Sequence, residues 1–332
     1  MTFKLGITRD VLDSTGQPSF GTAALKVLDT SPAIAWEYLP ERITEVTPDL
    51  ASRYDGLYVN SPKVTRNSVG RADCTLKIIA RHGVGYDSID VKALSERGIV
   101  LTNTPFAIRR PVAVAALTMI FALAGRLPTK DRLTRQNRWH ERTNHMGVGL
   151  TTRTIGLIGA GGIGEELLKL AKPFFARLLA ADPYARPARL AELGAELVSL
   201  DRVIGEADFV VVCCLLNDET FHLVNAARLA LMKPTAFLIS LARGPIIDEP
   251  ALIEVLRNNR IAGAGIDVFE KEPVDPANPL LTLDNVVLTP HSLCWTDECF
   301  HEMASTGLRS IVDVSLGKRP VHVVNPDIYA SR

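Results

Sequence analysis

The stretch TIGLIGAGGIGEELLKLAKPFFARLLAAD, residues 154–182, decides the fold of this chain. Its apolar start, residues 155–158, predicts a strand that runs into a glycine-rich turn of the form G-x-G-x-x-G. Residues 165–172 then predict a helix, and a second strand ends in Asp182, 18 residues beyond Gly164. This order and spacing are typical of a βαβ unit that binds a dinucleotide.

The glycine-rich turn predicts a binding site for a pyrophosphate. Glycines let the backbone turn tightly and approach the phosphates, while the N-terminus of the following helix offers free N–H groups. Asp182 can accept hydrogen bonds from both ribose hydroxyls and would repel a 2′-phosphate, so we expect NAD rather than NADP, although Arg186 and Arg189 are near in sequence. The alternative is a structural turn without a ligand. The turn residues expected to bind the cofactor are Gly159, Gly161, Gly162, Ile163 and Gly164.

Composition describes an ordinary globular protein of about two domains. The 332 residues are 47% apolar and 22% charged, with 37 basic and 37 acidic residues, so a nucleic-acid partner is not expected. The longest apolar stretch, residues 112–125, is shorter than the roughly 18 residues of a membrane span and predicts a buried helix. Five cysteines, two of them adjacent, and an N-terminus without a signal-like apolar region favour the cytoplasm.

Two series of strand-like runs indicate two α/β domains with doubly wound parallel sheets, Rossmann-like or flavodoxin-like. The first series covers residues 4–8, 33–39, 56–60, 76–81 and 99–104, and the second covers 154–159, 177–182, 208–214, 236–241, 262–268 and 285–289. One long helix, from Arg109 to about Gln136, is expected between them. We predict a substrate domain from residues 1–103 with 296–332, an NAD-binding domain from 104–295, and an active-site cleft between the two.

Candidate functional side chains follow three strands of the second series. Arg243 comes after one strand, Asp267, Glu270 and Glu272 follow the next, and His291 follows the last. Parallel strands of an open α/β sheet end at one edge, where ligands bind, so these groups can converge. Taken singly, each has a plainer explanation as a surface ion pair, a solvated turn or a structural histidine.

The segment LTPHSLCWTDECFH, residues 288–301, raises the alternative of a zinc site. Its spacing presents His291, Cys294, Cys299 and His301 as four ligands. However, Thr296 is a plausible N-cap, and Phe300, Met303, Ala304, Leu308, Ile311 and Val312 form one apolar helical face. On that helix Cys299 and His301 point about 200° apart, so they cannot close one tetrahedral site, and no metal is expected.

These segments together resemble the D-isomer-specific 2-hydroxyacid dehydrogenases, a family of NAD(P)-dependent oxidoreductases. The resemblance covers nearly the whole chain. RHGVGYDSIDVKALSERGIVLTNTP, residues 81–105, is similar to the signature of the family's first domain, while GAGGIG, ARGPIIDEPAL, GAGIDVFEKEP and NVVLTPH match those of the second in order.

The resemblance implies roles for the three strand-end residues. His291 would be the acid that protonates the carbonyl oxygen of a 2-keto acid, and the base in the reverse direction. Glu272 would pair with His291, although Glu270 is a rival by proximity, and Arg243 would bind the substrate carboxylate. Asp267 would lie by the nicotinamide amide. Cys214, Leu215 and Leu241 would be further cofactor contacts, the last two at positions where the family often has a proline and an asparagine.

In the first domain the resemblance implies that Asn60, Ser61, Val84 and Gly85 contact the substrate. Asn60 stands where many members have arginine, which leaves the identity of the 2-keto acid open. The resemblance also implies a homodimer formed through the helix around residues 112–124. Alternatives are a phosphite dehydrogenase-like oxidoreductase and a non-enzymatic, corepressor-like protein that uses the same NAD-binding scaffold to bind partners.

Overall fold

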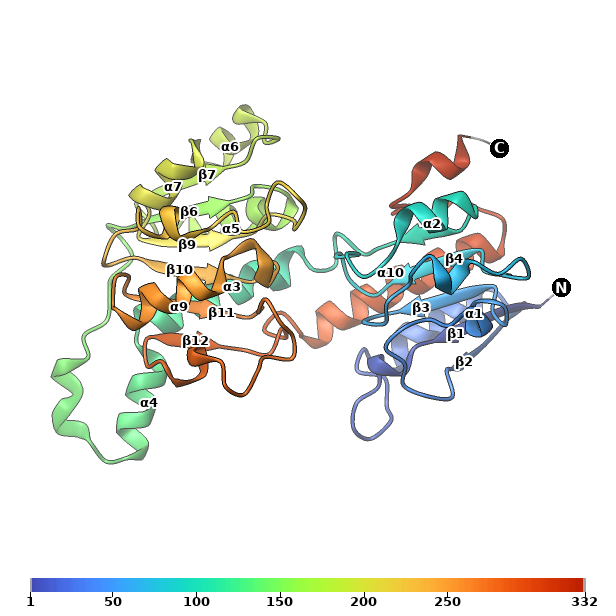
Figure 1. Ribbon diagram of the computed structural model, residues 1–332, viewed down its shortest axis with the longest axis horizontal. Helices are drawn as coiled ribbons and strands as arrows, with labels where there is room; N and C mark the ends of the chain where they lie inside the picture. Colours follow the sequence, from blue (N-terminus) through green and yellow to red (C-terminus); the bar gives the residue numbers. More distant parts are fainter. Residues whose placement is uncertain (1, 331–332) are drawn as a thin grey trace. The chain divides into compact units, whose positions relative to one another are not determined.

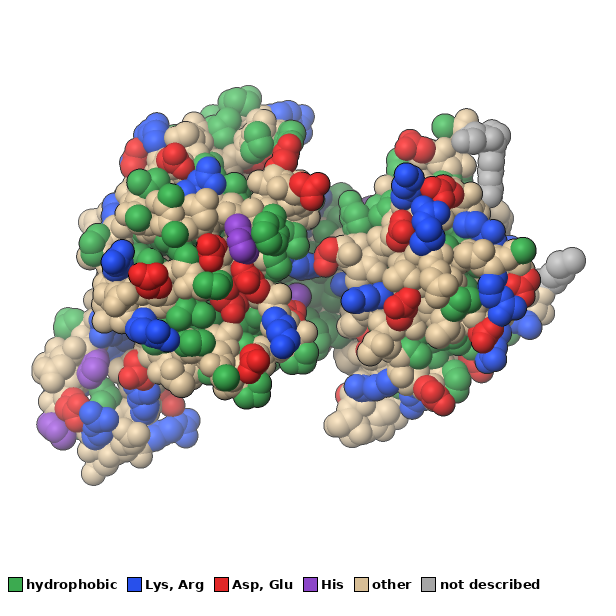
Figure 2. Space-filling view, in the orientation of Figure 1, with side chains coloured by type: hydrophobic (Ala, Val, Ile, Leu, Met, Phe, Trp, Pro, Cys, Tyr) green, Lys and Arg blue, Asp and Glu red, His purple; other side chains and the backbone are tan. Residues whose placement is uncertain are grey.

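The structure is a computed structural model that describes residues 2–330, and the chain divides into two compact units (Figure 1). The first unit runs up to Ile108 and resumes at Trp295, and the second covers Arg109–Cys294. Each unit is built on its own parallel sheet, so the chain is an α/β protein as the alternating pattern predicts. Acidic and basic side chains are interspersed over the visible face of both units, in keeping with their equal numbers (Figure 2).

The first unit contains a five-stranded sheet in the order β2-β1-β3-β4-β5. Its strands are β1 (Phe3–Ile7), β2 (Ile34–Tyr38), β3 (Gly56–Val59), β4 (Ile78–Arg81) and β5 (Val100–Thr102). The helix α10 (Asp297–Ser315) and the 3₁₀ segment Thr22–Thr30 cover one face. The short helices α1 (Pro48–Ala51) and α2 (Val91–Glu96) cover the other.

The second unit contains a seven-stranded sheet in the order β12-β11-β10-β9-β6-β7-β8. Its strands are β6 (Thr154–Ile158), β7 (Arg177–Ala181), β8 (Ala195–Leu197), β9 (Phe209–Val212), β10 (Phe237–Ser240), β11 (Gly263–Ile266) and β12 (Val286–Leu288). All neighbouring pairs are parallel, so the carboxyl ends of all seven strands lie at one edge.

Helices cover both faces of this second sheet, which is why its central strands are apolar throughout. One face packs against α3 (Arg109–Ala124), α5 (Gly162–Ala171) and α6 (Pro187–Leu193). The other packs against α7 (Leu200–Glu206), α8 (Ala226–Leu229) and α9 (Glu249–Arg257). The strand β8 was not predicted, because three residues at a sheet edge give too short a pattern to recognise.

The prediction of one long helix from Arg109 to about Gln136 was wrong. The chain forms α3 and a separate helix α4 (Leu127–Arg135), which are bent by 57°. Gly125 closes α3 through a hydrogen bond from its N–H to the carbonyl oxygen of Phe121, and Arg126 then takes a left-handed φ of 50°. Within the described residues no single helix is long and apolar enough to span a membrane, and α3 and α4 meet that requirement only together, across this bend.

The predicted helix after residue 296 is confirmed as α10. The Thr296 side chain accepts a hydrogen bond from the N–H of Cys299 (3.2 Å), as an N-cap does. The six apolar residues expected on one face, Phe300, Met303, Ala304, Leu308, Ile311 and Val312, are all buried. They pack against the first sheet, so this last helix completes the core of the first unit.

Candidate functional site

The candidate residues of the second unit meet at the carboxyl edge of the seven-stranded sheet. Gly159 follows β6 and Asp182 follows β7, while Cys214 comes shortly after β9. Arg243 follows β10, Asp267 follows β11 directly, and His291 lies three residues beyond β12. Ligands of open α/β sheets bind at this edge, beyond the ends of the strands.

The glycine-rich turn has the shape that close backbone packing requires. Gly159 has a φ of 95°, and a Cβ there would stand 2.6 Å from the backbone nitrogen of Cys214. A Cβ on Gly164 would stand 2.6 Å from the carbonyl oxygen of Gly159. Gly161 instead faces open space, with nothing within 4 Å of its Cβ position. The turn is therefore packed on one side and open to a ligand on the other.

A cavity of about 690 Å³ opens beside this turn. Gly159, Gly161 and Asp182 line it, as do the predicted contacts Cys214 and Leu215. Two carboxylates, Asp182 and Glu219, stand in its described lining, which includes no lysine or arginine. Its size is within the usual range for small-molecule and cofactor sites.

Asp182 is held rigidly at the wall of the cavity. Its Oδ2 accepts a hydrogen bond from the N–H of Ala160 (2.7 Å), and its Oδ1 accepts one from the N–H of Tyr184 (2.8 Å). A carboxylate oxygen can accept more than one hydrogen bond, so both retain capacity for a ligand. The Tyr184 hydroxyl donates to Glu219 (3.2 Å), which joins two loops that line the cavity.

The adjacent cysteines behave as packing residues. Burial is the main cause that raises the pKa of Cys213 to about 12 and of Cys214 to about 11. Both thiols are therefore protonated at neutral pH and are poor nucleophiles. Neither of the two forms a disulfide bond.

Sequence reasoning missed several residues around the turn. Arg109 lies at the start of α3, close to Gly162. A Cβ on Gly162 would collide with the Arg109 guanidinium. Arg109 therefore brings a positive charge to the N-terminus of α5, where an anion is favoured. No sequence signal links it to the turn, 53 residues away. The cavity walls at Tyr184, Glu219, Thr220 and residues 197–200 were missed for the same reason.

His291 and Glu272 are joined directly. His291 Nδ1 lies 2.8 Å from Glu272 Oε2, while Glu272 Oε1 accepts a hydrogen bond from the N–H of Phe269 (3.0 Å). Burial raises the pKa of Glu272, but these two hydrogen bonds, together with the charges of His291 and Arg243, outweigh burial and lower it. Of the two rival glutamates, Glu272 contacts His291 and Glu270 contacts a different histidine, His222.

Asp267 fixes the loop that carries His291. Its side chain is buried, and Oδ1 accepts hydrogen bonds from the Thr289 hydroxyl (2.6 Å), the Ser292 N–H (3.0 Å) and the Leu293 N–H (3.3 Å). His291 itself has a φ of 53°, a conformation that costs free energy for a residue other than glycine. The carboxylate thus holds the histidine in a strained backbone position.

Arg243 lies between β10 and a short 3₁₀ turn, Gly244–Ile246. Its Nη1 donates to the carbonyl oxygen of Ala242 (2.7 Å), and its charge acts on Glu272. Leu241, just before it, is partly buried and packs against the core that α3 and α5 share. This edge thus joins a histidine, a carboxylate and a guanidinium in one electrostatic group.

In the first unit, Asn60, Ser61, Val84 and Gly85 follow β3 and β4 at the carboxyl edge of that sheet. Three N–H groups in these loops are already engaged: Asn60 donates to Thr8 Oγ1 (3.4 Å), Ser61 to Asp10 Oδ2 (2.6 Å) and Gly83 to Thr104 Oγ1 (3.1 Å). The carbonyl oxygen of Val84 accepts a hydrogen bond from the Asn103 side chain (2.9 Å), which holds this glycine-rich loop.

The suggestive spacing of residues 288–301 does not assemble into a metal site. Cys299 is buried inside α10, and His291 is engaged with Glu272. Among residues 2–330, no group of three or more histidine, cysteine, aspartate and glutamate side chains could hold a metal ion.

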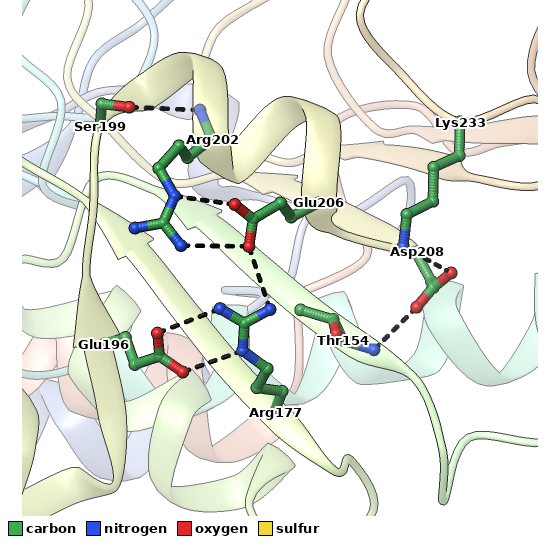
Figure 3. Close-up of polar contacts among 8 residues, drawn as sticks. All are labelled: Thr154, Arg177, Glu196, Ser199, Arg202, Glu206, Asp208 and Lys233. Atoms are coloured by element: carbon green, nitrogen blue, oxygen red, sulfur yellow. Dashed lines mark hydrogen bonds and ion pairs between the residues drawn. The ribbon is translucent and has the colours of Figure 1, made fainter.

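The opposite edge of the seven-stranded sheet carries a different polar cluster (Figure 3). Arg177, at the start of β7, binds Glu196 through two hydrogen bonds (2.9 and 3.0 Å) and Glu206 through a third (3.0 Å). Asp208, just before β9, accepts from the N–H of Thr154 (2.9 Å) and from Lys233 Nζ (3.2 Å). Arg202 also binds Glu206 (2.7 Å), so three basic and three acidic side chains neutralise one another.

Comparison with known proteins finds a matching family model and related proteins. The family model described as "D-isomer specific 2-hydroxyacid dehydrogenase, NAD binding domain" matches residues 117–292. The glyoxylate reductase of Thermococcus onnurineus is 37% identical over 303 residues, 90% of each chain. The D-3-phosphoglycerate dehydrogenase of Synechocystis is 38% identical over 277 residues, which are 83% of this chain but 50% of that protein.

The solved structures show the same fold over the whole length. The crystal structure of a glyoxylate reductase from Paecilomyes thermophila superposes with a TM-score of 0.84 at 26% identity, covering 98% of this chain and 100% of that one.

Proposed function

Because the chain belongs to the D-isomer-specific 2-hydroxyacid dehydrogenase family and is an NAD-binding oxidoreductase, we propose that it interconverts a 2-keto acid and a D-2-hydroxy acid. The observation that carries this proposal is the hydrogen bond between His291 and Glu272, within the field of Arg243. It joins a proton-transfer group to a carboxylate beside a cation suited to binding a substrate carboxylate.

In this proposal His291 is the general acid. Its Nδ1 is engaged by Glu272, which leaves Nε2 to donate a proton to the carbonyl oxygen of the keto acid. Glu272 fixes the orientation of the ring and stabilises its protonated form, since an adjacent carboxylate favours the imidazolium. In the oxidative direction Nε2 accepts the hydroxyl proton instead.

Arg243 takes the substrate carboxylate and polarises the reacting carbonyl. A planar guanidinium can bind a carboxylate through two parallel hydrogen bonds, which fixes the substrate as well as binding it. Its charge also stabilises negative charge that develops on the carbonyl oxygen. The N–H groups of Val84 and Gly85 and the side chains of Asn60 and Ser61 are proposed as further substrate contacts.

The cavity beside the glycine-rich turn is the proposed site of the cofactor, which supplies or accepts the hydride when bound. The open side of Gly161 and the N-terminus of α5 would hold the pyrophosphate, with Leu241 and Asp267 toward the nicotinamide. Asp182 would bind the ribose hydroxyls. NAD is proposed over NADP because the described lining carries two carboxylates and no lysine or arginine, so it repels a 2′-phosphate.

A homodimer is proposed through the exposed apolar surface of α3 and its continuation. Val114 and Phe121 on α3 are 46% and 40% exposed, and Trp139 and Met146 beyond α4 are 56% and 75% exposed. Large exposed apolar side chains on neighbouring segments often mark an interface. Light scattering coupled to size-exclusion chromatography would return the mass of one chain if this assignment were wrong.

The test of the function is a panel of 2-keto acids, including glyoxylate and hydroxypyruvate, followed by NADH absorbance at 340 nm. At least one should be reduced, with NADH preferred to NADPH. A protein that binds NADH but turns over no member of the panel would refute the proposal. The panel also ranks the substrates.

A further inference from the structure

We infer that His222 and Glu270 form a positioning pair, which holds the loops of Arg243 and Glu272 in the geometry that catalysis requires. His222 Nε2 lies 2.7 Å from Glu270 Oε1, and both side chains are about one-third exposed or less. The inference rests on the proposed function and assigns neither residue a contact with substrate. It explains why one short segment, residues 270–272, contains two glutamates that bind two different histidines.

Glu270 also exchanges two hydrogen bonds with Glu249, the first residue of α9. The N–H of Glu249 donates to Glu270 Oε1 (3.2 Å), and the N–H of Glu270 donates to Glu249 Oε2 (3.0 Å). Asn278 Nδ2 donates to the other oxygen of Glu249 (2.7 Å). His222 contacts the same Oε1 of Glu270 that accepts the Glu249 N–H, so its ring is part of this group of contacts.

His222 connects the Glu249–Glu270 pair to the loop of Arg243. Its backbone N–H donates to the carbonyl oxygen of Pro245 (2.9 Å), two residues beyond Arg243. Val224 then donates to Ile246 (3.0 Å), and Asp248 donates back to Val224 (3.1 Å). Backbone and side chain of His222 therefore tie the arginine loop and the glutamate loop to the same segment.

The two loops are in contact at Gly244, where there is no room for a Cβ. A Cβ on Gly244 would stand 2.0 Å from the carbonyl carbon of Phe269 and 2.4 Å from the nitrogen of Glu270. Gly244 directly follows Arg243, and Phe269 donates to Glu272. A shift of Glu270 is therefore transmitted to both proposed catalytic groups.

The backbone conformation of His222 is strained. Its φ is 47°, in the left-handed region, and its ring stacks on that of Phe221 with 4.1 Å between centroids. Such strain persists only where surrounding contacts impose it, and it is found preferentially at functional sites.

The test compares steady-state kinetics of Glu270→Ala, Glu270→Gln and wild type with the best 2-keto acid of the panel. Misplacing reacting groups by about 1 Å costs on the order of 100-fold in rate, so Glu270→Ala should lose roughly 10- to 100-fold in kcat. Its dissociation constant for NADH, from fluorescence titration, should change less than about threefold, since Glu270 does not line the cofactor cavity. Glu270→Gln keeps an acceptor oxygen and should recover most of the rate.

A second variant, His222→Asn, tests the same pair in case Glu270→Ala does not fold. Asparagine tolerates a left-handed backbone, so His222→Asn removes the ring without adding strain. The double variant with Glu270→Ala should be no slower than the slower single variant, because both remove one interaction. Glu196→Gln, which weakens an ion pair at the opposite edge, is the matched control and should keep the wild-type kcat.

Three results would overturn the inference. Wild-type kcat in Glu270→Ala, even with a lower melting temperature, would make the pair purely structural. Losses that multiply in the double variant would show that the two residues act independently. A wild type that reduces no 2-keto acid would remove the proposed function, and this inference with it, whereas an active wild type with insensitive variants would remove the inference alone.

Discussion

The two edges of the seven-stranded sheet both carry charged side chains, yet they use them differently. At the amino edge, Arg177 binds both Glu196 and Glu206, and Asp208 is matched by Lys233 (Figure 3). At the carboxyl edge, Asp182 lines a cavity of about 690 Å³, and the loop of His291 is held by hydrogen bonds to the buried Asp267. Charges that neutralise one another stabilise a fold, whereas charges held rigidly beside empty space are available to a ligand.

The direction of the strands explains the difference. In a parallel sheet every strand enters at one edge and leaves at the other, so helix N-termini and their free N–H groups gather at the carboxyl edge. The amino edge receives helix C-termini and the starts of strands. The comparison therefore predicts large functional effects from substitutions at one edge and small ones at the other.

The largest effect is expected for His291→Ala. Loss of a general acid typically costs about 10²- to 10⁴-fold in rate, so kcat should fall by that amount. The dissociation constant for NADH should stay near wild type, because His291 does not line the cofactor cavity. Stopped-flow turnover and NADH fluorescence titration measure the two quantities. A large loss of NADH binding would show that the proposed role of His291 as general acid is wrong.

Asp182→Ala should change cofactor choice rather than chemistry. Removing the carboxylate relieves repulsion of a 2′-phosphate and removes the acceptor for the ribose hydroxyls, so the ratio of kcat/KM for NADH over NADPH should fall by about tenfold or more, about 1.4 kcal/mol. Parallel assays with the two reduced cofactors give the ratio. If it did not change, Glu219 or another lining residue would have to be the determinant.

Glu272 should make stability depend on pH in the acid range. Its folded pKa is lowered, so its contribution to the free energy of unfolding is complete above the ordinary glutamate pKa and is lost as pH falls through the folded value. The difference between wild type and Glu272→Gln, from chemical denaturation at pH 7 to 3, should shrink on acidification. It should stay below about 1 kcal/mol, because the pair is partly exposed. A difference that grew on acidification would contradict the lowered pKa.

The smallest effect is expected at the amino edge. Glu196→Gln weakens two hydrogen bonds to Arg177, and exposed ion pairs contribute about 0–1 kcal/mol to stability. Its melting temperature should fall slightly, with kcat and KM unchanged. A large loss of activity in this variant would break the division between the two edges.

Local pattern predicted much of this arrangement. The strand, glycine turn and helix of residues 154–172 are contiguous in sequence, and so is the apolar face of α10, so both were predictable. The break between α3 and α4 depends on a left-handed Arg126, which residue type does not reveal. Arg109 against Gly162, and His222 with Glu270, are contacts across 53 and 48 residues that only the folded sheet brings together.

The most direct test of the central claim uses NADH deuterated at its transferring position with the best 2-keto acid of the panel other than glyoxylate, whose product has no stereocentre at C2. The product, analysed by mass spectrometry and chiral chromatography, should carry one deuterium on C2 and have the D configuration. The proton on its oxygen should come from solvent through His291. A product without deuterium on C2, or one of L configuration, would contradict the assignment of the carboxyl edge as the site of a D-specific hydride transfer.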